Sequence, residues 1–248
     1  MNVAQEMIKP YGDTLNDGLV QLSFALPVEN SARAKKAAEL YVSKLNFENI
    51  KVVHAKKIGD NFTYFVVFAK AIPDLDYSEV NASEIEIVEM DYHAINERIR
   101  KELNRPVCVV GGTIGSDAHT VGIDAIMNMK GYKKDYGLER YSQIKAFNLG
   151  AQVSCESLVR KALDVGADAI LISQTLTKND NHILNFRELI GLLNEKGIRQ
   201  RFILIAGGPG ITNDTALELG YDAGFGPGTL PSQVASFLVE KLVASKRK

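Results

Sequence analysis

The stretch VCVVGGTIGSDAHTVG, residues 107 to 122, joins an apolar run to a glycine-rich turn and then to the start of a helix. Its first six residues are apolar or glycine, so both faces of the predicted strand are suited to burial. A strand buried on both faces is typical of a parallel sheet between two layers of helices. The helix that follows is expected over residues 122–131, with Gly131 ending it.

The rest of the C-terminal half repeats this alternation of strand and helix. The patterns predict strands over 144–150, 167–176, 201–208 and 221–226, and helices over 155–166, 183–197, 212–220 and 231–246. Such alternation predicts a parallel sheet with helices on both faces. We therefore expect a Rossmann-like α/β domain over residues 104–248, with five parallel strands in the flavodoxin-like order 2-1-3-4-5.

The N-terminal part has a different pattern, which predicts a small α+β domain over residues 1–103. A polar connector, 72–83, interrupts this part and leads into a further helix that reaches residue 103. Before the connector, the patterns predict strand, helix, strand and strand over 19–28, 30–47, 50–59 and 61–72.

Composition limits the classes of function. The net charge of −1 gives no electrostatic footprint for nucleic acid or a membrane surface. No apolar segment approaches the 18 or so residues of a membrane span. The first residues lack the apolar run of a signal peptide, and the two cysteines lack a CxxC or metal-ligand spacing. We expect a cytoplasmic protein.

In a parallel sheet, ligands bind outside the carboxyl ends of the strands. The five loops at that edge are rich in glycine or hydroxyl residues, which allow close backbone approach and supply small donors. They span residues 111–122, 148–154, 173–180, 207–212 and 224–229. For any one loop, an ordinary short turn is an equal alternative. The first loop lacks the GxGxxG spacing of a dinucleotide site.

His119 is the strongest candidate for a functional residue in these loops. Asp117 is close enough in sequence for its carboxylate to bond one ring nitrogen of His119, which would make the other nitrogen a better metal ligand. One histidine is too few to build a zinc or iron site from protein ligands alone. It can be one axial ligand of a metal whose other positions are filled by a macrocycle.

Three short elements resemble the DxHxxG, SxL and GG signature of cobalamin-binding domains. They are Asp117-x-His119-x-x-Gly122, Ser173 and Gly207-Gly208. The second element departs from the pattern, because the chain reads Ser173-Gln174-Thr175 and Leu176 comes one place late. The resemblance implies that His119 replaces the dimethylbenzimidazole base as the lower ligand of cobalt. It also implies a cofactor site formed by Ser116, Asp117, His119, Thr120, Gly122, Ser173, Thr175, Gly207, Gly208, Gly226 and Gly228.

Longer strings resemble the small, cobalamin-carrying subunits of the lysine 5,6-aminomutases. They are IKPYGDTLNDGLVQLSFALP (8–27), GTIGSDAHTVGIDAIMNMKGY (112–132) and YGLERY (136–141). The resemblance implies an isomerase of lysine degradation that uses adenosylcobalamin and pyridoxal phosphate in a radical 1,2-amino migration on D-lysine or L-β-lysine. It also implies a larger TIM-barrel partner, self-association through the N-terminal domain, and a heterotetramer.

Lys130 gains a role from the same resemblance, which implies that it forms an imine with pyridoxal phosphate in the resting enzyme. Lysine is the residue suited to bond an aldehyde in this way. From the residues alone, a structural role is the commoner explanation: the helix macrodipole favours a lysine in the last turn of a helix. Lys133 and Lys134 fit a charged turn. The connector 72–83 and the start of the helix in the nineties are candidate hinges.

Other readings remain open. A corrinoid methyl carrier would share Asp117, His119, Gly122, Ser173 and the two glycines, but such carriers usually have an all-helical N-terminal cap. A flavodoxin-like protein with FMN gives no reason for the Asp-x-His pair. Ornithine 4,5-aminomutase is a close relative in which the cobalamin domain is typically fused to the barrel, so a free-standing chain favours the lysine enzyme.

Overall fold

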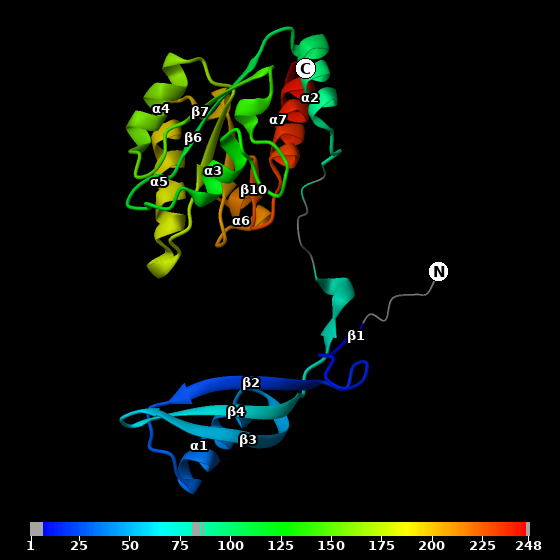
Figure 1. Ribbon diagram of the computed structural model, residues 1–248, viewed down its shortest axis with the longest axis vertical. Coiled ribbons are helices and arrows are strands. Elements are labelled where there is room, and N and C mark those ends of the chain that lie inside the picture. Colours follow the sequence, from blue (N-terminus) through cyan, green and yellow to red (C-terminus); the bar gives the residue numbers. More distant parts are fainter. Residues whose placement is uncertain (1–6, 81–84, 86, 247–248) are drawn as a thin grey trace. The chain divides into compact units, whose positions relative to one another are not determined.

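The computed structural model describes residues 7–80, 85 and 87–246. The chain divides into two compact units, Met1–Asn81 and Ala82–Lys248 (Figure 1). The last three residues of the predicted connector, 81–83, and residue 84 lie outside the described residues.

The first unit has an antiparallel sheet of strands β2, β4 and β3, in that order, with helix α1 on one face (Figure 1). Ala34, Ala38 and Val42 of α1 pack on Phe65 and Val67 of the central strand β4. This confirms the predicted β-α-β-β order. The elements are β1 (Met7–Ile8), β2 (Leu19–Leu26), α1 (Ala32–Ser43), β3 (Phe47–Gly59), β4 (Phe62–Ala71), β5 (Leu75–Asp76) and η1 (Tyr77–Glu79).

The second unit is built on five parallel strands in the order β10-β9-β8-β6-β7. Counted from the first strand along the chain, this is 2-1-3-4-5, so the flavodoxin-like prediction is confirmed. The strands are β6 (Val107–Gly112), β7 (Ile144–Asn148), β8 (Ala169–Ser173), β9 (Ile203–Gly207) and β10 (Ala223–Phe225). All six residues of β6 are buried, as a central strand of such a sheet requires.

Helices cover both faces of this sheet (Figure 1). One core contains residues of α2 (Tyr92–Arg98), α3 (Val121–Met127) and α7 (Pro231–Lys246). The other contains residues of α4 (Cys155–Asp164), α5 (Asn181–Glu195) and α6 (Asn213–Glu218). Short helical turns complete the unit: η2 (Ile99–Leu103), η3 (Leu138–Arg140), η4 (Lys178–Asp180) and η5 (Arg199–Arg201). No helix of the described residues has the length and apolarity to cross a bilayer.

Helix α2 and the turn η2 belong to the second unit, although the sequence boundary placed them in the first. Ile95, Ile99 and Leu103 are buried in the core that also contains the apolar residues of α7. Arg98 forms an ion pair with Glu240 of α7. The boundary between the compact units therefore lies before this helix, not after it.

Helix α3 is shorter than the predicted helix 122–131. It ends at Met127, and the backbone of Asn128 is extended. The side chain of Asn128 accepts a hydrogen bond from Asn148 Nδ2 at 2.7 Å, and its carbonyl accepts one from the N–H of Gly131 at 2.9 Å. These bonds turn the chain out of the helix, so Lys130 lies in a turn beyond it.

Candidate functional site

Asp117 organises the loop after β6. Its side chain is buried, and its carboxylate accepts backbone N–H groups from His119 at 3.0 Å, Thr175 at 2.5 Å and Leu176 at 3.1 Å. Burial alone would raise the pKa of Asp117, but these hydrogen bonds and the one to the His119 ring outweigh it, so the pKa is lowered. The carboxylate therefore links the loops after β6 and β8.

The imidazole of His119 is held by this carboxylate at one nitrogen and is open to solvent at its other side. Nδ1 lies 2.8 Å from Asp117 Oδ1, and 58% of the side chain is exposed. A carboxylate at Nδ1 keeps the proton there and leaves the lone pair of Nε2 for a metal. Among the described residues, no group of three or more His, Cys, Asp or Glu side chains could hold a metal ion. The site therefore fits a metal that brings its other ligands with it.

Two glycines let the loops approach the end of β8 closely. A Cβ on Gly122 would lie 2.4 Å from Ser173 Oγ, and one on Gly208 would lie 2.0 Å from the Gln174 carbonyl oxygen. Gly208 also has a φ of +134°, which side chains rarely tolerate. The three sequence elements therefore meet at one place, residues 173–176.

Gln174, where the chain departs from the SxL pattern, has a structural role. Its side chain is buried, and Nε2 donates to the carbonyl oxygen of Ile114 at 3.0 Å. Its Oε1 accepts from Asn185 Nδ2 at 2.8 Å. These bonds fix the loop whose next two backbone N–H groups hold Asp117.

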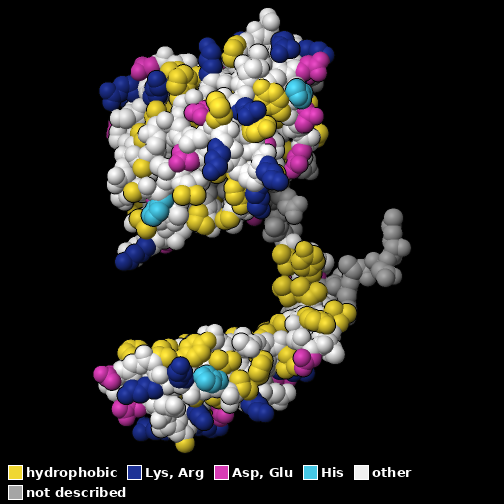
Figure 2. Space-filling model, viewed as in Figure 1, with side chains coloured by type: hydrophobic (Ala, Val, Ile, Leu, Met, Phe, Trp, Pro, Cys, Tyr) yellow, Lys and Arg dark blue, Asp and Glu magenta, His cyan; other side chains and the backbone are white. Residues whose placement is uncertain are grey.

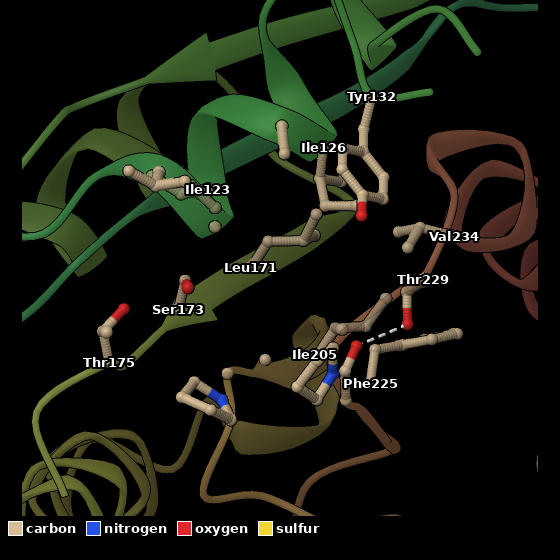
Figure 3. A pocket seen from close by; sticks show the side chains of 18 of the residues that line it. Ile123, Ile126, Tyr132, Leu171, Ser173, Thr175, Ile205, Phe225, Thr229 and Val234 are labelled. Atoms are coloured by element: carbon tan, nitrogen blue, oxygen red, sulfur yellow. Dashed lines mark hydrogen bonds between the residues drawn. The ribbon is translucent and has the colours of Figure 1, made fainter. Parts of the chain in front are cut away.

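A pocket of about 320 Å³ opens beside this junction, at the carboxyl ends of β8, β9 and β10 (Figure 3). Its walls are mainly apolar, with the hydroxyls of Ser173, Thr175 and Thr229 as small polar groups. Such a mixture suits an organic ligand that a few polar contacts orient. Seven of the residues expected at the cofactor site line it: Gly122, Ser173, Thr175, Gly207, Gly208, Gly226 and Gly228.

The sequence elements did not identify the side walls of the pocket. Ile123 and Ile126 come from α3, Leu171 and Ile205 from the sheet, and Figure 3 shows Tyr132 reaching in from the loop after α3. Other wall residues are Phe225 and Val234. The rule that ligands lie at the carboxyl ends of parallel strands gives the only signal for them.

Four expected residues do not line the pocket: Ser116, Asp117, His119 and Thr120. Ser116 is exposed in the turn before Asp117. Thr120 precedes α3 but makes no side-chain capping bond to it. With His119, they belong to the loop surface beside the pocket.

Lys130 lies in the turn between α3 and a short hairpin, and hydrogen bonds hold both the turn and the hairpin in place. The N–H of Met129 donates to Glu139 Oε2 at 2.8 Å, and Tyr132 pairs with Asp135 across a two-residue turn. Asp135 Oδ2 accepts the N–H of Ser232 at 2.9 Å, which fixes the hairpin to the start of α7. The Lys130 side chain is exposed and has no ion-pair partner among the described residues.

Replacing Gly122 with alanine should damage the junction without unfolding the unit. The added methyl would overlap Ser173 Oγ, so α3 or the end of β8 must move. Overpacking of this kind costs about 1–3 kcal/mol. We expect a lower melting temperature and, in a spectroscopic titration, weaker binding of the cobalamin that the sequence resemblance implies. Gly191→Ala is the control, because a Cβ there meets nothing within 4 Å; equal behaviour of the two variants would contradict the prediction.

Comparison with known proteins agrees with this geometry. Residues 107–235 match the family model of the B12 binding domain, and residues 7–84 match that of the dimerisation domain of D-ornithine 4,5-aminomutase. The second unit is thus a cobalamin-binding α/β domain.

Similar proteins cover nearly the whole chain. It is 47% identical over 237 residues to the lysine 5,6-aminomutase beta subunit of Acetoanaerobium sticklandii, covering 96% of this chain and 90% of that protein. It is 48% identical over 236 residues to that of Fusobacterium nucleatum, covering 95% and 90%. The chain belongs to the lysine 5,6-aminomutase beta subunit family.

The D-ornithine enzyme is a more distant relative. The chain is 33% identical over 237 residues to D-ornithine 4,5-aminomutase subunit beta of A. sticklandii. The match covers 95% of this chain but 30% of that larger protein. The chain is therefore a cobalamin-binding aminomutase subunit, and aminomutases are isomerases.

Proposed function

We propose that this chain carries adenosylcobalamin for a radical 1,2-amino migration on D-lysine or L-β-lysine, in an enzyme of lysine degradation that also uses pyridoxal phosphate. When bound, adenosylcobalamin supplies a carbon radical by homolysis of its cobalt–carbon bond. The observation that carries the proposal is the pair Asp117 and His119, whose 2.8 Å contact leaves Nε2 for cobalt. Ser173 and the glycines of the pocket would hold the nucleotide tail that His119 displaces.

Lys130 is proposed as the amine that bonds the aldehyde of pyridoxal phosphate, most of whose site lies in a larger TIM-barrel subunit. Its exposed position in the turn before the hairpin supports this role, because the amine is accessible and hydrogen bonds hold the backbone on both sides of it. Release of Lys130 by the substrate amine would then let the cobalamin unit move, with the connector 72–83 as the hinge.

Self-association through the N-terminal unit completes the proposal, with a heterotetramer as the assembly. The match of residues 7–84 to a dimerisation domain supports it.

A cytoplasmic location is supported by two buried free thiols. Burial raises the pKa of Cys155 to about 12 and that of Cys108 above its usual value, so both stay protonated.

The alternative, a corrinoid methyl carrier, is less well supported. It would use the same Asp117, His119 and pocket, but the β-α-β-β unit and Lys130 would have no role in it. Copurification of pyridoxal phosphate and a larger subunit would favour the aminomutase, and their absence the carrier.

The decisive experiment is the EPR spectrum of cob(II)alamin bound to uniformly ¹⁵N-labelled protein. A two-line nitrogen splitting is expected, because the axial ligand would be the labelled His119. A His119→Ala variant should lose that pattern, whereas His93→Ala, on α2, should keep it. A three-line pattern from the wild type would mean that the cofactor's own unlabelled base holds cobalt, and would overturn the proposal.

A further inference from the structure

The sheet of the first unit has one covered face and one open face. Phe65, Val67 and Ala69 of β4 pack under α1 and are buried. The residues that alternate with them point the other way, because successive side chains of a strand lie on opposite faces. Phe62 and Phe68 are 48% and 43% exposed there. The row along β4 is Phe62, Tyr64, Val66 and Phe68, here called the β4 row.

The two flanks of the β4 row differ in charge. On the β2 side it pairs with uncharged residues, and on the β3 side with basic ones. The β2 neighbours of Phe68, Val66 and Tyr64 are Gln21, Ser23 and Ala25, and their β3 neighbours are Lys51, His54 and Lys56. Figure 2 shows hydrophobic side chains gathered on the side of this unit away from α1. An aromatic row of this kind, edged by polar groups, is typical of a protein interface.

We propose that the β4 row is the surface on which a second copy of this chain packs. The inference depends on the self-association proposed above and assigns it to one face of the sheet. A second copy is the occupant because residues 7–84 match a domain described by its dimerisation. Two-fold packing places a residue near the axis against its own copy, so one apolar row is enough to form the contact.

The charges select one of the two face-to-face arrangements. A two-fold axis across the strands would lay the basic β3 flank on the same flank of the partner copy, which brings like charges together. A two-fold axis along the strands instead lays the basic β3 flank of one copy over the uncharged β2 flank of the other. It also keeps the β4 row of one copy over the β4 row of the other. Aligned sheets pack with their strands about 30° apart, so the row still meets itself near its middle, at Val66.

Cysteine crosslinking of the full-length chain tests the face. In Val66→Cys, a short bis-maleimide should join two copies, because the two thiols lie near the axis. The native Cys108 and Cys155 are buried and give little background. Lys35→Cys, exposed on the opposite side on α1, is the matched control and should stay monomeric on a denaturing gel. Crosslinking of Lys35→Cys but not of Val66→Cys would overturn the proposal, as would a Val66→Cys product with the larger subunit.

Sedimentation separates this inference from the functions proposed above. Phe68→Asp should weaken self-association about 100-fold or more, since interface aromatics commonly carry most of the binding energy. Leu40→Asp, on α1 and similarly exposed at 55%, should have no effect. A Phe68→Asp dimer of wild-type strength would exclude this face but leave self-association standing. A monomeric wild type would exclude both, while the two-line EPR pattern would still support the cobalamin assignment.

Discussion

Replacing Asp117 with asparagine should both destabilise the cobalamin unit and weaken cobalamin binding. The two carboxylate oxygens accept from different groups: Oδ1 from His119, and Oδ2 from the N–H groups of Thr175 and Leu176. An amide has one acceptor, so either orientation sets an N–H₂ group against backbone donors. Leaving buried donors unpaired here costs about 2–4 kcal/mol.

The weaker cobalamin binding follows from the bond between Asp117 Oδ1 and the His119 ring. Without the carboxylate at Nδ1, the imidazole loses both its orientation and its preferred tautomer. Cobalt ligation is the role proposed for His119, and losing a hydrogen-bond partner of a metal-ligating histidine usually costs about 10–100-fold, so we expect cobalamin affinity to fall by that factor. Urea unfolding and a spectroscopic titration measure the two effects. Asp164→Asn, an exposed aspartate at the end of α4, is the control. Unchanged stability and affinity in Asp117→Asn would show that the junction does not depend on this carboxylate.

The order of elements was predictable because it depends on local patterns. The apolar run of β6 and the alternation after it were enough to predict the strand order, since only a few arrangements of parallel strands bury such strands on both faces. The placement of α2 was not predictable, because its apolar stripe specifies burial but not the partner. Its partner, α7, lies at the other end of the domain's sequence.

The site was predictable as a set of loops but not as a set of contacts. Asp117 and His119 are two residues apart in the chain, so their 2.8 Å contact could be expected. The donors from Thr175 and Leu176 are backbone groups, which leave no signal in residue identity. The early end of α3 depends on a bond between Asn128 and Asn148, which no local pattern contains.

If Lys130 bonds pyridoxal phosphate as proposed, replacing it with alanine should abolish covalent attachment of that cofactor to this subunit. The macrodipole explanation for Lys130 no longer holds, because α3 ends at Met127 and its last turn contains no basic residue. An exposed lysine amine on a well-fixed turn is instead suited to form an imine with an aldehyde. Borohydride reduction of the complete enzyme, followed by mass spectrometry of the small subunit, should find the label on Lys130 in the wild type and none in Lys130→Ala.

Lys133→Gln and Lys134→Gln are the matched controls, because both lysines lie close to Lys130 in the chain, in the two-residue turn of the hairpin. Both have a positive φ, which glutamine disfavours no more than lysine does. Both should keep the label on Lys130. The cob(II)alamin EPR pattern should be the same in all three variants, since none of the three lysines lines the pocket. A label that persists on the small subunit of Lys130→Ala would assign the bond to another amine. Equal turnover and equal cofactor stability in Lys130→Ala would exclude a role for the Lys130–pyridoxal phosphate bond in holding the cobalamin unit, because release of Lys130 by substrate would then have no consequence for the reaction.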